Sequence, residues 1–204
     1  MNDSPSEQLA QHVARKVGGL QKRLLSNDPS ARGELAVLRR AVTKTAGSVP
    51  EAYGSTLSDL PDALVGRTDE PSRAEAIAHS VIALFSVHAQ SSSEAVHVPG
   101  VGLGEAVRRL AYATGGDSVD GHPILRRFHA LMTADSFGET SHHLRGLIQQ
   151  LKAERIPLDY AQLATDLWFF SQPRSRDSVR LRWSRDLYRT LHTNTRNNDS
   201  HTTS

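Results

Sequence analysis

Two adjoining segments decide the fold that this chain can adopt: LDYAQLATDLWFFSQ (158–172) and PRSRDSVRLRWSRDLYR (173–189). In the first segment, apolar residues cover most of the circumference of a helix, which predicts a helix at the centre of a larger helical assembly. In the second, Val179, Trp183 and Leu187 recur at intervals of four and predict an apolar side. Its arginines occupy another side, so one side of this helix can pack while the other presents charge.

Apolar residues that recur at intervals of three and four predict further helices along the rest of the chain. A cap at Asp28 and a first position at Pro29 mark the start of one of them. These helices are expected at 7–25, from 29 to about 44, at 51–60, at 71–90, after Gly102, from Pro123, and from a cap at Thr140 or Ser141 to 151. No segment has a confident strand pattern, and 96–98 is too short to build a sheet. The predicted fold is therefore all-α, a compact bundle of about eight or nine helices with no sheet.

The predicted domain organisation follows from the same pattern. Residues 1–6 are polar and are expected to form a flexible N-terminus. Residues 7–192 are expected to form a single helical domain, or two packed helical halves at 7–113 and 122–192. The tail at 193–204 contains no aromatic or aliphatic residue, so we expect it to be disordered.

The composition restricts the class of protein. Hydrophobic residues make up 38% of the 204 positions and charged residues 23%, as in an ordinary globular protein. The absence of cysteine excludes disulfides and thiolate metal sites. No apolar run approaches the ~20 residues that a membrane helix needs, and the N-terminus lacks the pattern of a signal peptide. The sequence predicts a soluble cytoplasmic protein that has no membrane partner.

The motifs that would indicate catalysis or a cofactor are weak. The glycines at 100, 102 and 104 lack the preceding strand and the Walker lysine of a phosphate-binding loop, and a plain flexible loop is the better interpretation. The ten histidines contain no HExxH motif. Asp159 and Asp166 lie seven residues apart and resemble a carboxylate pair, but a helix cap and a partner for a nearby arginine are the simpler interpretation. We therefore expect no catalytic residue, metal or cofactor, and we expect Trp168 and Trp183 in the core.

Clustered basic residues recur on five predicted helices. Net charge is only +2, so any binding to nucleic acid must depend on local clusters. Guanidinium groups match phosphate oxygens, and such contacts carry little sequence information. The alternative is an ordinary solvated basic surface. The candidate nucleic-acid-binding residues are Arg32, Arg39, Arg40, Lys44, Arg108, Arg109, Arg126, Arg127, Arg145, Arg180, Arg182, Arg185 and Arg189.

Several segments together carry a family resemblance. The specific ones are HLRGLI (143–148), IPLDYAQLATDL (156–167) and VRLRWSRDLYR (179–189), and the weaker ones are GELAVLRR (33–40) and LFSVH (84–88), which leads to LGEA (103–106). In this order they resemble the CasB family, the small subunit of the type I-E CRISPR Cascade surveillance complex. The resemblance spans about residues 32–189. One departure is that the family usually has a Trp-Gln step before the proline of the basic segment, where this chain has Phe170, Ser171 and Gln172.

The resemblance implies a non-catalytic, all-helical subunit that is present as two copies in a ribonucleoprotein. The implied partners are the repeated backbone subunits, the large subunit, the second copy, the CRISPR guide RNA, and target DNA including its displaced strand. Its implied role is to hold the R-loop open through backbone contacts. R-loop formation is close to energetic balance, so modest contacts can tip it. The alternatives from other classes are a helical protein-binding adaptor and a helical metal-dependent hydrolase or nuclease.

Overall fold

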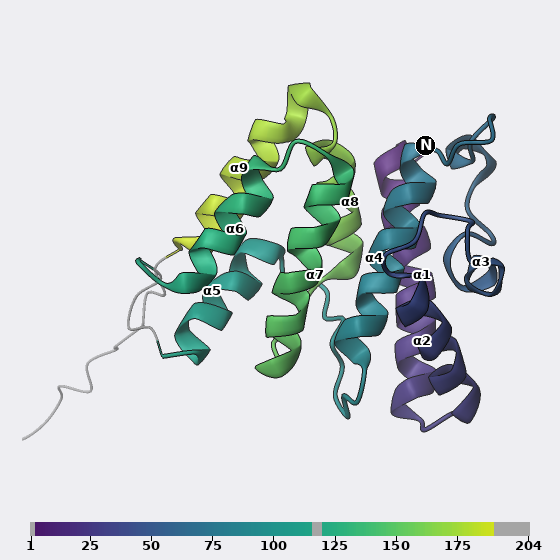
Figure 1. The fold of residues 1–204 in the computed structure, drawn as a ribbon, viewed down its shortest axis with the longest axis horizontal. Helices are drawn as coiled ribbons and strands as arrows, with labels where there is room; N and C mark the ends of the chain where they lie inside the picture. Colours follow the sequence, from purple (N-terminus) through teal and green to yellow (C-terminus); the bar gives the residue numbers. More distant parts are fainter. Residues whose placement is uncertain (1–2, 116–119, 190–204) are drawn as a thin grey trace, which may run out of the picture.

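The computed structural model describes residues 3–115 and 120–189 (Figure 1). Within these ranges the chain forms nine α-helices and one 3-10 helix, and it has no strand beyond an isolated parallel bridge between His97 and Leu158. The all-α prediction is confirmed. The elements are α1 (Pro5–Leu25), α2 (Pro29–Ala41), α3 (Pro50–Thr56), η1 (Asp62–Leu64), α4 (Arg73–Ala89), α5 (Leu103–Ala113), α6 (Pro123–Thr133), α7 (Phe137–Ala153), α8 (Tyr160–Phe170) and α9 (Pro173–Leu187).

Helices α4 and α8 lie at the centre of the arrangement. Helix α4 contacts α1, α2, α7 and α8, and α8 contacts α1, α4 and α9. Figure 1 shows α1, α2 and α3 on one side of the molecule and α5, α6 and α9 on the other. Helix α5 packs against α6, α7 and α9, so it groups with the helices that follow it in the chain. The predicted tail at 193–204 lies outside the described residues.

Helix starts follow local capping chemistry. Asp28 caps α2 and Pro29 begins it, as predicted. Helix α1 begins at Pro5, inside the segment expected to be flexible, because Ser4 and Glu7 form a capping box. The predicted cap of α7 at Thr140 or Ser141 is wrong: Ser136 caps this helix by accepting from the Glu139 backbone N–H at 3.1 Å. Phe137 and Gly138 form the first turn of this helix.

A buried carboxylate joins α8 to α9. The indole Nε1 of Trp183 donates to Asp166 Oδ2 at 2.6 Å, and Arg182 Nη2 donates to Asp166 Oδ1 at 2.5 Å. The Trp183 ring stacks on Phe170 with 5.3 Å between centroids. Trp183 is therefore in the core, as predicted. Trp168 is only half-buried, and the Arg73 guanidinium lies over its ring at 5.3 Å, so the prediction of a core position is too strong there.

The glycines at 100–104 have a packing role that the sequence did not indicate. Gly100 has a φ of +86°, Gly102 is the N-cap of α5, and Gly104 lies inside α5. A Cβ on Gly104 would lie 2.2 Å from the Trp183 carbonyl oxygen and 2.9 Å from Asp186 Cβ. Helices α5 and α9 can therefore approach this closely only because residue 104 has no side chain. The flexible-loop interpretation is wrong for Gly104.

We expect Gly104→Ala to lower the free energy of unfolding by about 1–3 kcal/mol, because the new methyl group meets the backbone of α9 and forces the helices apart. Gly19→Ala in α1 is the matched control. Nothing lies within 4 Å of its Cβ position, so the same change should stabilise the protein by about 0.5–1 kcal/mol. Urea denaturation measures both. Similar effects for the two variants would contradict the close α5–α9 contact.

Candidate nucleic-acid interface

Most of the arginines on α9 bind within the fold. Arg180 Nε donates to the Met132 carbonyl at 2.7 Å, and its Nη1 pairs with Asp177 at 3.0 Å. Arg189 pairs with Asp186 at 2.9 Å, and Arg182 pairs with Asp166. Among the α9 candidates, only Arg185 is exposed and has no hydrogen bond or ion pair to the described residues. The helix that the sequence made the most prominent candidate is therefore mainly structural.

Other candidates are also engaged. Arg108 is only 6% exposed, and its Nη1 donates to the Arg189 carbonyl at 2.7 Å, so it holds the end of α9 and is not accessible to a polymer. Arg109 pairs with Glu105 at 2.5 Å. Arg32 donates to the Asn27 side chain at 3.1 Å. Arg108 and Arg109 are adjacent in the sequence, but one is buried and the other is exposed, because neighbouring positions face different sides of a helix.

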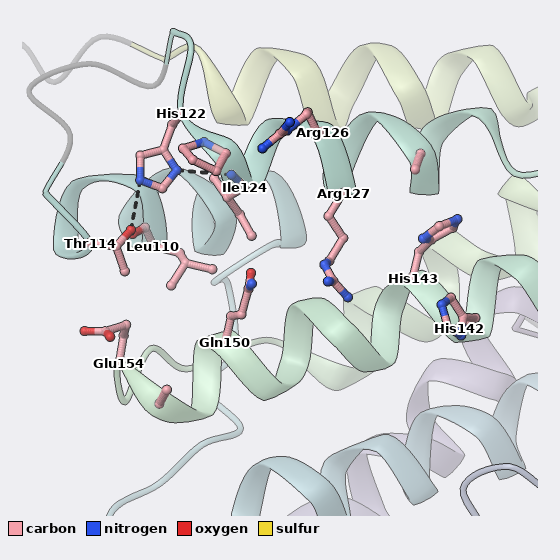
Figure 2. A pocket seen from close by; sticks show the side chains of 13 residues that line it. Leu110, Thr114, His122, Ile124, Arg126, Arg127, His142, His143, Gln150 and Glu154 are labelled. Carbon is pink, nitrogen blue, oxygen red and sulfur yellow. Dashed lines mark hydrogen bonds between the residues drawn. The ribbon is translucent and has the colours of Figure 1, made fainter.

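A basic groove lies between α6 and α7. It encloses about 650 Å³, and its lining includes Arg126 and Arg127 from α6 and His142 and His143 from α7. Figure 2 shows Arg127 extending from α6 toward α7, with His142 and His143 farther along α7. The two arginines are exposed and make no hydrogen bond or ion pair with the described residues. Their charges are therefore available to an anionic partner.

Gly146 makes room for one of these arginines. A Cβ on this buried glycine of α7 would overlap the guanidinium of Arg127, at 1.7 Å from Nη1. The absence of a side chain at residue 146 lets the Arg127 guanidinium rest against the backbone of α7. Gly146 lies in the segment that carries the family resemblance, although nothing in the sequence pattern indicated why a glycine is needed there.

His142 connects this groove to a second cavity. The second cavity, of about 360 Å³, is lined by His142, Arg145 and Lys44 among others. Lys44 and Arg145 are exposed and have no ion pair among the described residues. We name the resulting surface the α6–α7 basic band, and it consists of Lys44, Arg126, Arg127, His142, His143 and Arg145. His143 Nε2 lies 3.7 Å from Glu139 Oε1, so the cations of the band without an anionic partner among the described residues are Lys44 and the three arginines.

A second group of basic residues lies beside α7. Arg32 and Arg39 line a cavity of about 530 Å³ next to the loop at 90–93. Burial, and secondly the positive charge of Arg39, lower the pKa of Lys152 on α7. Arg145 and Lys152 are seven residues apart and share a side of α7, which brings this group alongside the basic band. The seven-residue spacing of Arg145 and Lys152 in the sequence indicates that they share this side of the helix. Arg40 is exposed on α2.

The two carboxylates that resembled a catalytic pair are occupied by protein donors. Asp159 caps α8 by accepting from the Gln162 backbone N–H at 3.0 Å, and its other oxygen accepts from Gly100 N–H at 2.8 Å. Asp166 binds Arg182 and Trp183. The simpler interpretation, a cap and an arginine partner, is confirmed. No group of three or more histidine and carboxylate side chains in 3–115 and 120–189 is arranged to hold a metal.

These features define an all-helical protein that presents, on a surface built by α6 and α7, arginines without an anionic partner in the described part of the chain. None of the described helices combines the length and apolar character required to cross a bilayer. Residues 34–188 match the family model described as CRISPR-associated protein Cse2. The chain belongs to this family, that of CasB, the small subunit of type I-E Cascade, as its sequence resemblance predicted.

Solved structures agree with this assignment. CasB from Thermobifida fusca is 31% identical with a TM-score of 0.75, and the match covers 88% of this chain and 97% of that one. CasB from Thermus thermophilus is 21% identical with a TM-score of 0.60, over 91% and 99% of the two chains. A second structure from Thermus thermophilus, a CRISPR-associated protein of the Cse2 family, is 22% identical with a TM-score of 0.62, over the same shares. No curated protein sequence matches the chain significantly.

The Arg182–Asp166 pair provides a test of which arginines are structural. Burial raises the pKa of Asp166, and Arg182 is the first of the groups that oppose this rise. Arg182→Ala leaves the ionised carboxylate without its cation, so we expect the free energy of unfolding to fall by about 1–3 kcal/mol at neutral pH. This expected fall in the free energy of unfolding is smaller than for a fully buried ion pair, because the Arg182 side chain is 42% exposed.

The matched control is Arg185→Ala, three residues along the same helix, for which we expect a change within about 0.5 kcal/mol. The loss in Arg182→Ala should shrink in acid once Asp166 is protonated, because a neutral carboxyl group needs no cation. Urea denaturation at neutral and acidic pH measures both effects. Equal losses for the two variants would show that the pair does not hold the fold.

Proposed function

We propose that this chain is a non-catalytic subunit of a type I-E Cascade complex that binds the nucleic-acid backbone through its α6–α7 basic band. In this role it stabilises the R-loop and the displaced DNA strand during antiviral interference. The observation that carries the proposal is a set of exposed cations on α6 and α7 that have no anionic partner among the described residues. These cations lie on a chain that belongs to the family of Cascade small subunits.

Electrostatics favours a phosphate backbone as the partner of this surface. An arginine that already pairs with a carboxylate gives up that contact when it binds phosphate. Arg126, Arg127 and Arg145 have no carboxylate partner among the described residues, so they lose no ion pair on binding. Each phosphate that is neutralised releases condensed counterions, which makes the binding favourable at low salt and indifferent to base sequence. Backbone contacts of this kind suit a subunit that acts after guide RNA has selected the target.

The proposed partners are the repeated backbone subunits, the large subunit, a second copy of this chain, guide RNA and target DNA, within the cytoplasm. The non-catalytic character is supported by the hydrogen bonds of Asp159 and Asp166, which leave neither carboxylate free to act as a base or to hold a metal. The proposal also assigns the remaining cations near the band, Arg39, Arg40 and Lys152, to the same polymer surface.

A salt titration tests the proposal. We expect Arg126→Ala combined with Arg127→Ala to weaken binding to single-stranded DNA of two unrelated sequences by similar factors. The slope of log affinity against log salt should fall by roughly 0.7 for each phosphate contact that is lost. The two arginines are exposed and unpaired, so the free energy of unfolding should change little.

The matched control is Arg15→Ala combined with Arg67→Ala, which removes the same charge from exposed positions on α1 and in the loop before α4. It should leave the salt slope close to that of the wild type. Equal reductions in both double variants would indicate an effect of net charge alone and would contradict binding at the basic band. A loss that is confined to one DNA sequence would contradict recognition through phosphate.

A further inference from the structure

The outer side of α9 carries a regular row of exposed residues. They recur at alternating intervals of four and three, so they lie on one side of the helix and extend about 21 Å along its axis. The opposite side holds the buried Val179, Trp183 and Leu187. Figure 1 shows α9 at an edge of the molecule. We name this surface the outer stripe of α9, and it consists of Arg174, Ser178, Leu181, Arg185 and the C-cap residue Tyr188.

Two large apolar side chains of the outer stripe are exposed to solvent. Leu181 is 51% exposed, the highest value among the exposed large hydrophobic residues of the described chain, and Tyr188 is 48% exposed. They are seven residues apart, which places them two turns apart on the same side of α9. Apolar surface gains free energy when another apolar surface covers it. The described fold leaves these two side chains uncovered, so a second molecule must supply that surface.

The charges of the outer stripe determine the chemistry of its partner. Arg174 and Arg185 are exposed, and their side chains make no hydrogen bond or ion pair with the described residues. Along the stripe, the two arginines alternate with Leu181 and Tyr188. A complementary surface therefore alternates carboxylates with apolar side chains.

A partner helix fits this pattern better than a nucleic-acid strand. Alternating intervals of three and four are the spacing with which one helix packs along another. Arg174 and Arg185 lie about 16 Å apart along the axis, with Leu181 between them, and a leucine side chain contributes nothing to a phosphate contact. Tyrosine and arginine, by contrast, are enriched in the interfaces between proteins.

We propose that the outer stripe of α9 packs against an acidic amphipathic helix of another protein subunit of the complex. The apolar side of that helix covers Leu181 and Tyr188, and its carboxylates pair with Arg174 and Arg185. A single stripe of this length makes a small interface, so the contact acts together with others in the assembled complex. This inference rests on the proposed function, because the complex supplies the partner.

Removal of the two apolar side chains tests the proposal. Leu181→Ser combined with Tyr188→Ser removes both from the stripe. Tyr53→Ser combined with Val65→Ser is the matched control, because these residues are 49% and 41% exposed and lie in the part of the chain that precedes α4. The measurement is the affinity of each variant for a complex that contains guide RNA and the other subunits but lacks this chain.

We expect the apolar stripe variant to bind this complex about tenfold more weakly than the wild type, and the control to bind as the wild type does. Arg174→Glu combined with Arg185→Glu should weaken binding by a similar factor, most strongly at low salt, because it places like charges opposite the carboxylates of the partner. The substituted residues are exposed, so the free energy of unfolding of each variant should stay close to that of the wild type.

The affinity of the free chain for single-stranded DNA separates this contact from the basic band. Arg15→Glu combined with Arg67→Glu makes the same change of charge at exposed positions outside the stripe. The salt slope of the charge-reversed stripe variant should match that of this control. A lower slope in the stripe variant would place the stripe on the nucleic-acid surface, and the partner helix would be wrong.

The remaining outcomes separate this proposal from the proposed function. If both stripe variants bound the complex as the wild type does, the docking site would be overturned and the proposed function would stand. If the wild type itself did not bind, both proposals would be overturned. If sedimentation showed that the free chain self-associates and that the stripe variants do not, the occupant would be a second copy of this chain and the partner helix would be wrong.

Discussion

The fold depends on one buried carboxylate. Asp166 is 1% exposed, and a charge at that depth is tolerated only if its oxygens are hydrogen-bonded. Trp183 and Arg182 provide those bonds from α9, and Gln162 adds another from within α8. The contact fixes the rotation of α9 about its axis, because residues 182 and 183 must both reach α8. That rotation in turn places the Trp183 carbonyl against Gly104 and sets the approach of α5.

This constraint also separates structural arginines from available ones. With α9 oriented by Asp166, Arg180 reaches the Met132 carbonyl and Arg189 pairs with Asp186, so several arginines of this basic segment are engaged within the fold, while Arg185 stays exposed. The unpaired cations of the basic band lie on α6, α7 and the segment after α2, where no carboxylate among the described residues pairs with Arg126, Arg127, Arg145 or Lys44. A small net charge is therefore compatible with a strongly basic surface, because pairing neutralises one part of the molecule and leaves another unpaired.

Local rules predicted much of the fold. The interval of four from Val179 to Trp183 and Leu187 identified the packed side of α9, and all three residues are buried. The Asp28-Pro29 pair located the start of α2. Arg108 and Arg109 show where such rules stop: both looked like surface cations, yet only tertiary packing places Arg108 beneath the end of α9. The same limit applies to the basic band, since Lys44 and Arg127 are distant in sequence. A glycine needed for close approach, such as Gly104 or Gly146, looks like a turn or a helix breaker until its neighbour is known.

The central claim is that the chain works as a Cascade subunit that contacts nucleic acid, and co-purification tests it most directly. The tagged chain is expressed with the other subunits and a CRISPR guide RNA, and native mass spectrometry gives the composition of the complex that it retains. We expect a ribonucleoprotein that contains guide RNA and two copies of this chain. Recovery of the chain by itself, with neither RNA nor other subunits, would contradict the claim.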